Sequence, residues 1–199
     1  MMIIKNKGLC WTCHEHKLSC IHIPKCASTT IKHSLNYVAD DFHKLPSEYF
    51  TFTVLRNPYE RFFSAYAEAL RRSEAKDILP FPDSASSINR AIDLLEGGVY
   101  EPHFVPQNKL LTKNDGTTLN INKYIWFDTF ERDVMTMYGN MGMRDYTISI
   151  MNTNDNSVKD CVRDIVINSG QLKDRIASVY KADFDLINSV FAGRYKLRL

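Results

Sequence analysis

The N-terminal part of the chain alternates short apolar runs with amphipathic stretches. Residues 19–23 form an apolar run rich in Ile, which Pro24 ends. Residues 28–38 then place apolar side chains at helical spacing, at Ile31, Leu35 and Val38. This pattern predicts a strand, a tight loop and a helix.

A second strand-to-helix unit follows. Residues 49–55 are rich in β-branched and aromatic side chains, and Asn57 and Pro58 after them are suited to cap and to start a helix. The predicted helix has an apolar stripe made of Tyr59, Phe62, Phe63, Tyr66 and Leu70. Its other face is predicted to hold Glu60, Arg61, Ser64, Glu68 and Arg71.

The alternation continues along the chain. The pattern predicts helices at residues 86–96 and 131–138, a buried strand at residues 124–127, and one or two closing helices at residues 171–191. The stops and turns between them are Gly97, Gly98, Asp115, Gly116 and Gly139. Strands alternating with helices predict an α/β fold with a mainly parallel central sheet flanked by helices. Ligands of such sheets bind beyond the carboxyl ends of the strands.

The composition indicates one compact domain. A chain of 199 residues with 44% hydrophobic and 24% charged residues can bury a core, so residues 1–199 are expected to form a single domain. Residues 1–19 are expected to be an N-terminal hairpin or extension, and residues 20–199 the core. The formal net charge of +2 is too small to favour a nucleic-acid partner or a membrane surface.

The N-terminus and the cysteines indicate a compartment. The apolar residues 1–4 are followed at once by Lys5, so no signal peptide or membrane anchor is expected. The cysteines are Cys10, Cys13, Cys20, Cys26 and Cys161. An odd number, with four crowded at one end, is a poor disulfide framework and favours a reducing cytoplasm.

The loop between the first predicted strand and helix is suited to bind an anion. Lys25 and three hydroxyl residues, Ser28, Thr29 and Thr30, lie where the helix begins. A helix start offers unpaired N–H groups and a positive dipole end, and Lys25 adds a full charge. The alternative is a Ser/Thr-capped helix with an exposed lysine. The spacing is not that of a Walker loop.

Arg56 and Ser64 form a second candidate anion site. Arg56 ends a predicted strand, and Ser64 lies about two turns into the next helix, so both could reach one ligand. The planar guanidinium suits a phosphate monoester because it can donate two parallel hydrogen bonds. The alternative is a surface arginine and a helix serine with no shared partner.

Together the two segments resemble the nucleotide-binding motifs of the sulfotransferase superfamily, whose donor is 3′-phosphoadenosine 5′-phosphosulfate (PAPS). The first resembles the 5′-phosphosulfate loop, and the second resembles the 3′-phosphate motif, an Arg with a Ser eight positions later. The resemblance implies a P-loop-like nucleotide-binding fold with residues 20–199 as the catalytic core. It implies that the 5′ side is bound by Lys25, Cys26, Ala27, Ser28, Thr29 and Thr30, and the 3′ phosphate by Arg56 and Ser64.

Later segments resemble the carbohydrate sulfotransferases that act on chondroitin and dermatan. These are residues 101–107, with His103, and residues 126–131 and 179–184, so that the resemblance spans about residues 21–188. It implies a hydroxyl acceptor on a carbohydrate. Animal members carry a membrane anchor that is not expected here, and Cys26-Ala27 replaces a glycine-containing pair of related loops. These departures from the family pattern bear on the identity of the acceptor more than on that of the donor.

The resemblance also implies a mechanism. Lys25 and the helix start would stabilise the leaving 3′-phosphoadenosine 5′-phosphate (PAP), a general base would take the acceptor proton, and no metal is required. We favour His103 as the base from its family-like context. His43 is the alternative, because related heparan-type enzymes place a catalytic His between the two nucleotide motifs.

Other functions are compatible with parts of the sequence. Cys10, Cys13 and His14 satisfy the C-x-x-C-H pattern of c-type haem, and His16, Cys20 and His22 nearby could suggest zinc. We expect instead a hairpin that packs Trp11 and half-buried thiols. A nucleotide kinase would need a Walker spacing and an acidic magnesium motif, which we do not find. A non-catalytic nucleotide-binding or glycan-binding module would keep Lys25 and Arg56 without a base.

Overall fold

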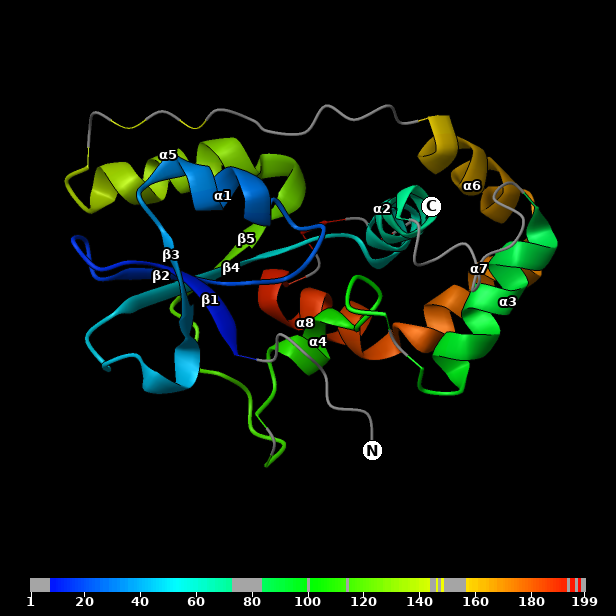
Figure 1. The fold of residues 1–199 in the computed structure, drawn as a ribbon, viewed down its shortest axis with the longest axis horizontal. Helices are drawn as coiled ribbons and strands as arrows, with labels where there is room; N and C mark the ends of the chain where they lie inside the picture. Colours follow the sequence, from blue (N-terminus) through cyan, green and yellow to red (C-terminus); the bar gives the residue numbers. More distant parts are fainter. Residues whose placement is uncertain are drawn as a thin grey trace. The chain divides into compact units, whose positions relative to one another are not determined.

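The computed structural model describes residues 8–72, 84–99, 101–113, 115–143, 146, 148, 157–192, 194, 195 and 197 (Figure 1). The chain divides into two compact units. Unit 1 comprises Met1–Ile4, Asn57–Pro106 and Asn154–Leu199, and unit 2 comprises Lys5–Arg56 and Gln107–Thr153. No helix in the described ranges is both long enough and apolar enough to cross a membrane.

Unit 2 is built on a five-stranded sheet in the order β3-β1-β2-β4-β5. Its strands are β1 (Leu9–Cys13), β2 (Leu18–Ile21), β3 (Val38–Asp41), β4 (Phe50–Leu55) and β5 (Lys123–Trp126). The pairs β2·β4 and β4·β5 are parallel, whereas β1 is antiparallel to both β2 and β3. The prediction of an α/β fold is confirmed, but the sheet is mixed rather than mainly parallel. The reason is that β1 and β2 are joined by a tight turn, which forces an antiparallel pair.

Two helices cover one face of the sheet in unit 2. They are α1 (Ser28–Ser34) and α5 (Phe130–Asn140), which Figure 1 shows on the same side of the strands. The Tyr138 hydroxyl of α5 lies 3.2 Å from both the Ser34 and Tyr37 hydroxyls, which links the two helices. Burial raises the pKa of Tyr138 above its ordinary value, so the hydroxyl stays protonated and can donate a hydrogen bond.

Some element boundaries differ from the expected ones. The helix predicted at residues 28–38 ends at Ser34, because Leu35 is already extended and Val38 begins β3. Val38 is 48% exposed, so its helical spacing from Ile31 did not reflect burial. The helix predicted at residues 131–138 is α5, which continues through the expected stop at Gly139 to Asn140. The short elements are η1 (Phe42–Lys44), α4 (Gln107–Leu110) and η3 (Phe127–Thr129).

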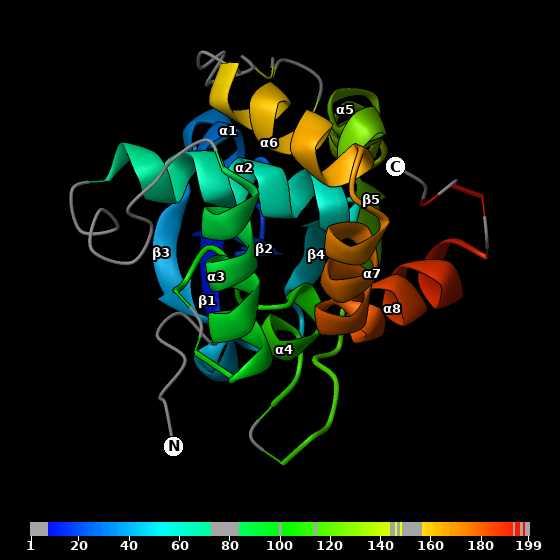
Figure 2. The ribbon, with the colours of Figure 1, turned by 90° about the vertical axis from the view of Figure 1, so that its right-hand side faces the viewer.

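Unit 1 is helical in its described residues. Its helices are α2 (Pro58–Arg71), α3 (Ala85–Glu96), α6 (Ser157–Ile167), α7 (Gly170–Val179) and α8 (Lys181–Phe191). Figure 2 shows α3 and α7 side by side, and α2 packs against α6. Asn57 caps α2 as predicted, because its side chain accepts from the Tyr59 N–H and Pro58 opens the helix.

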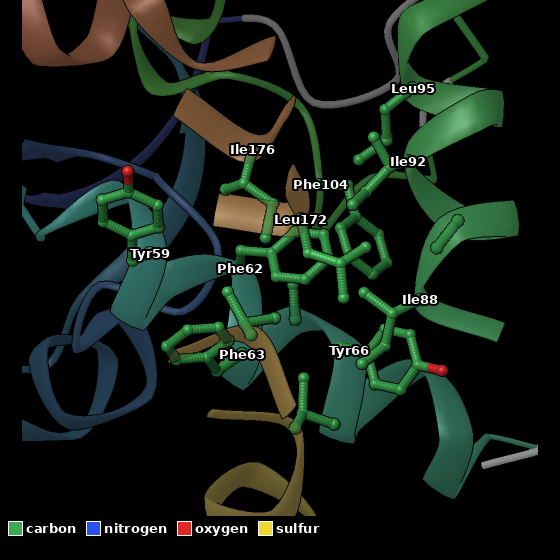
Figure 3. Packing of buried hydrophobic residues seen from close by; sticks show 14 of the residues in the cluster. Tyr59, Phe62, Phe63, Tyr66, Ile88, Ile92, Leu95, Phe104, Leu172 and Ile176 are labelled. Atoms are coloured by element: carbon green, nitrogen blue, oxygen red, sulfur yellow. The ribbon is translucent and has the colours of Figure 1, made fainter. Parts of the chain in front are cut away.

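The core of unit 1 is aromatic and aliphatic. The predicted stripe of α2 contributes Tyr59, Phe62, Phe63 and Tyr66, which pack with residues of α3 and α7 (Figure 3). The T-shaped pair of Phe62 and Phe104, with centroids 5.6 Å apart, brings the segment after α3 into this core. Arg61, which was predicted on the other face of α2, is only 1% exposed, so part of that face is buried as well.

Candidate active site

The carboxyl ends of several strands of unit 2 meet at one edge of the sheet. β2, β4 and β5 run in the same direction, so Ile21, Leu55 and Trp126 end at this edge. β3 ends there too, because it is antiparallel to β1 and β1 is antiparallel to β2. The loop after β2, Arg56 after β4, and His43 after β3 therefore share this edge.

The loop after β2 is a tight turn with an unusual backbone. The Cys26 N–H donates to the Ile23 carbonyl at 3.3 Å, and Pro24 and Lys25 occupy the two central positions. Lys25 has φ +67° and Ala27 has φ +57°, which is the left-handed region that disfavours residues with a Cβ. Each such residue costs on the order of 1 kcal/mol and persists where the surroundings fix it. Strain of this kind is typical of ligand-binding loops.

α1 begins directly after this loop. Its N-cap is Ala27, whose side chain makes no capping hydrogen bond. The alternative of a Ser/Thr-capped helix is therefore not what the structure has. The three hydroxyl residues differ in environment, since Thr30 is buried, Ser28 is half-buried and Thr29 is exposed. They do not all share one face.

Arg56 joins the end of β4 to this loop. Its Nη1 donates to the Lys25 carbonyl at 3.0 Å. Its guanidinium carbon lies 4.1 Å from the centroid of the Phe127 ring, a cation–π contact with the residue that follows β5. Only 9% of Arg56 is exposed. Unit 2 thus brings together the lysine loop and the arginine, two elements that are far apart in the sequence.

Gln107 is a third member of this cluster, and sequence reasoning gave it no role. Its Oε1 accepts the Arg56 N–H at 3.0 Å and the Cys26 thiol at 3.5 Å, and its Nε2 donates to the Arg56 carbonyl at 2.9 Å. The side chain is fully buried. A glutamine at the end of a histidine-containing segment was the only sequence signal, and it did not reveal its partners.

His43 is exposed, and its backbone N–H donates to Asp41 Oδ1 at 3.0 Å. Its ring packs against Gly8, where a Cβ would lie 2.8 Å from the ring Cδ2, and Gly8 itself has φ +84°. Since β1 lies between β3 and β2, His43 follows a strand about 10 Å from the strand that precedes Lys25.

The other predicted residues, Ser64 and His103, belong to unit 1. Ser64 is half-buried in α2, one turn after Arg61. Arg61 Nη2 donates to the His103 carbonyl at 3.0 Å, which ties the His103 turn to α2. The next residue is fixed as well, because the Tyr180 hydroxyl donates to the Phe104 carbonyl at 2.8 Å. The buried Arg61 therefore positions a loop rather than facing solvent.

His103 is oriented by Glu101, which sequence reasoning also missed. Glu101 Oε1 lies 2.6 Å from His103 Nδ1, and Oε2 accepts the backbone N–H of His103 at 2.8 Å. A carboxylate can only accept, so Nδ1 carries a proton, and in the neutral ring Nε2 is the acceptor. This is the tautomer that a general base requires.

The geometry of the described cysteines near the N-terminus does not favour a metal or haem site. Cys10 and Cys13 are three apart on β1, so their side chains point to opposite faces. Burial raises the pKa of the Cys10 thiol, which disfavours the thiolate that a metal needs. His14 contacts the Tyr49 hydroxyl at 2.9 Å. Among the described residues, no group of three or more His, Cys, Asp or Glu is arranged to hold a metal ion.

Comparison with known proteins decides the family. The sequence matches the Sulfotransferase family over residues 9–188, which is most of the chain. The chain belongs to the sulfotransferase family. No curated protein and no solved structure matches it. As a sulfotransferase it is an enzyme that acts on an acceptor substrate, and the family generally uses PAPS as the sulfate donor.

Proposed function

We propose that this sulfotransferase transfers the sulfuryl group of PAPS to a hydroxyl group of a carbohydrate. The observation that supports it most is the hydrogen bond from Arg56 to the Lys25 carbonyl, at the carboxyl edge of two adjacent parallel strands. An anion-binding loop and an arginine joined at that edge suit a ligand with two anionic groups. The donor with a 5′-phosphosulfate and a 3′ phosphate is such a ligand.

In this proposal the loop binds the 5′ side of the donor. Its residues are Lys25, Cys26, Ala27, Ser28, Thr29 and Thr30. Lys25 and Ala27 have left-handed backbones, a conformation that also occurs in anion-binding loops, and Lys25 supplies a full positive charge. Their role in the reaction is to stabilise negative charge that develops on the leaving phosphate.

The 3′ phosphate is assigned to Arg56 and Ser64. A guanidinium has five N–H donors, so the hydrogen bond to the Lys25 carbonyl is compatible with further donation to a phosphate. The guanidinium lies over the Phe127 ring, and this cation–π contact helps to hold the arginine side chain in place. This assignment follows from the match of both residues to the family motif.

The reaction is an in-line displacement at sulfur. The acceptor oxygen forms a bond to sulfur while the bond between sulfur and the 5′-phosphate oxygen breaks, and the electron pair leaves with PAP. The acceptor proton passes to Nε2 of His103, whose Nδ1–H is held by Glu101. His43 stays the alternative base, because it follows β3 at the edge where the lysine loop lies. The proposal requires no metal.

The remaining assignments are part of the same proposal. Residues 1–199 act as one sulfotransferase domain with residues 20–199 as the catalytic core, which is supported by a family match that runs through segments of both units. The crowded, odd-numbered cysteines support a reducing cytoplasm. The small net charge gives no support for a nucleic-acid partner.

Calorimetric titration tests the donor assignment. We expect the protein to bind PAP more tightly than adenosine 5′-phosphate or ATP, without magnesium. Arg56→Lys keeps the charge but loses the fork, so it should weaken PAP binding by about ten- to a hundredfold and leave adenosine 5′-phosphate binding nearly unchanged. The matched control is Arg132→Lys on the exposed side of α5.

The alternatives give different results. Tighter, magnesium-dependent binding of ATP would replace the proposal with a kinase. PAP binding without transfer from labelled PAPS to any of a panel of mono-, oligo- and polysaccharides would indicate a binding module. Transfer to a non-carbohydrate hydroxyl would correct the acceptor class alone.

A further inference from the structure

Gln107 connects two elements that the proposed function uses separately. Its primary amide forms two hydrogen bonds with the backbone of one residue, accepting from the Arg56 N–H and donating to the Arg56 carbonyl. This is the pairing that a neighbouring strand residue would provide, so the side chain extends the ladder of β4 beyond Leu55. Gln107 thereby fixes the backbone from which the Arg56 side chain projects.

The same amide also reaches the lysine loop. Gln107 Oε1 accepts the Cys26 thiol hydrogen at 3.5 Å, and Cys26 lies between the two left-handed residues Lys25 and Ala27. A thiol is a weak donor, but the contact is buried, where hydrogen bonds are strengthened. A strained loop requires neighbours that fix it. Gln107 is one such neighbour, and Arg56 Nη1 on the Lys25 carbonyl is another.

The burial of Gln107 indicates why the residue is an amide. With 0% exposure, each polar atom of the side chain must find a partner inside the protein. A Met or Leu of similar volume would fill the space, but it would leave the backbone N–H and carbonyl of Arg56 without these bonds. Filling the core alone does not need an amide here, whereas holding two backbone segments does.

We infer that Gln107 is a positioning residue of the donor site, which holds Arg56 and the loop around Cys26 at a fixed separation. The inference rests on the proposed function for its consequence, because the loop and Arg56 are assigned to the two anionic ends of the donor. Gln107 touches neither the donor nor the acceptor in this proposal. It acts through the two segments that it joins.

Amide hydrogen exchange of the ligand-free protein tests the bond directly. The Arg56 N–H donates to Gln107, so its exchange rate should rise about tenfold or more in Gln107→Met. The matched control is Thr53→Val in β4, which removes a buried hydrogen bond to the Ile21 carbonyl of the neighbouring strand β2. It should leave the Arg56 amide unchanged. An unchanged Arg56 rate in Gln107→Met would overturn the inference.

Calorimetry with PAP tests the consequence. We expect Gln107→Met to weaken binding about tenfold, equivalent to about 1.4 kcal/mol, and Thr53→Val to change it less than twofold. A faster Arg56 exchange without any loss of affinity would reduce Gln107 to a structural residue and overturn its positioning role. If the wild type binds no PAP, the proposed donor fails while the exchange experiment still decides the bond.

A second variant covers the case in which Gln107→Met does not fold. Cys26→Ala removes only the thiol contact and keeps the two bonds to Arg56. The amides of Ala27 and Ser28 should then exchange faster while that of Arg56 does not. Unchanged exchange in the loop would overturn the coupling of Gln107 to it.

Discussion

The Glu101 carboxylate forms two hydrogen bonds with His103, one to the ring and one to the backbone. Oε1 lies 2.6 Å from Nδ1 and Oε2 lies 2.8 Å from the backbone nitrogen. The bidentate contact fixes both the ring orientation and the turn, so that Nε2 is the nitrogen left to accept a proton. Arg61 also fixes this turn, because its Nη2 donates to the His103 carbonyl.

Replacing the carboxylate should therefore lower turnover without affecting the donor. In Glu101→Gln the amide can still contact the ring but no longer stabilises the imidazolium that forms when the base accepts a proton. We expect kcat to fall about ten- to a hundredfold with PAP affinity within twofold. Glu131→Gln, at an exposed carboxylate of α5, is the control. Equal kcat for Glu101→Gln and the wild type would exclude a role for this contact.

The choice between the two histidines can be made by comparing single variants. His103→Ala should reduce kcat by about a hundred- to ten-thousandfold and leave PAP binding intact, because the base acts on the acceptor proton. His43→Ala should keep turnover, since in this proposal its ring only packs against Gly8. Initial rates with labelled PAPS measure both. The opposite pattern would move the base to the end of β3.

Local periodicity predicted the strongly amphipathic elements and missed the polar ones. The stripe from Tyr59 to Tyr66 and the cap at Asn57 predicted α2, because both depend on neighbours in sequence. The edge strand β3 reads Val-Ala-Asp-Asp and is partly exposed, so nothing in its pattern marked it as a strand. The apolar spacing of Val38 extended the predicted helix into β3 instead. The mixed sheet was missed for another reason, because β1 lies in the N-terminal segment that was expected to be a hairpin or extension outside the core and was not assigned to the central sheet.

The candidate site was predicted in the same uneven way. Lys25 and Arg56 were identified because strand ends precede them, and the structure brings them together in unit 2. Gln107 was not identified from the sequence, because its partner Arg56 is distant in sequence and a single buried amide produces no periodic pattern. Glu101 lies only two residues from His103, yet spacing alone does not show that a side chain turns back to its neighbour.

An ion-pair cluster in unit 1 should make the free energy of unfolding depend on pH in the acidic range. Burial would raise the pKa of Glu60, but hydrogen bonds from Arg163 and Lys159 outweigh it and hold the pKa below its ordinary value of 4.5. A lowered folded-state pKa stabilises the protein above pH 4.5 and loses that effect as the pH falls further.

The variant Glu60→Gln should therefore lower the free energy of unfolding by about 0.5–1 kcal/mol at pH 7, a value reduced by partial exposure. The difference from the wild type should shrink as the pH falls below about 4.5. Urea unfolding at a series of pH values measures it, with Glu131→Gln as the control. A difference that stays constant with pH would assign the effect to packing.

The loop backbone provides a last prediction, because Ala27 occupies a conformation that glycine accepts more easily. At φ +57° a Cβ is disfavoured, so Ala27→Gly should raise the free energy of unfolding by about 0.5–1 kcal/mol. A β-branched side chain is disfavoured far more, so Ala27→Val should lower both stability and PAP affinity. Thermal unfolding and calorimetry on both variants measure these effects. If Ala27→Val bound PAP as tightly as the wild type does, the donor loop would not require a left-handed backbone at this position. PAP binding would then depend on the side chains around Ala27 alone.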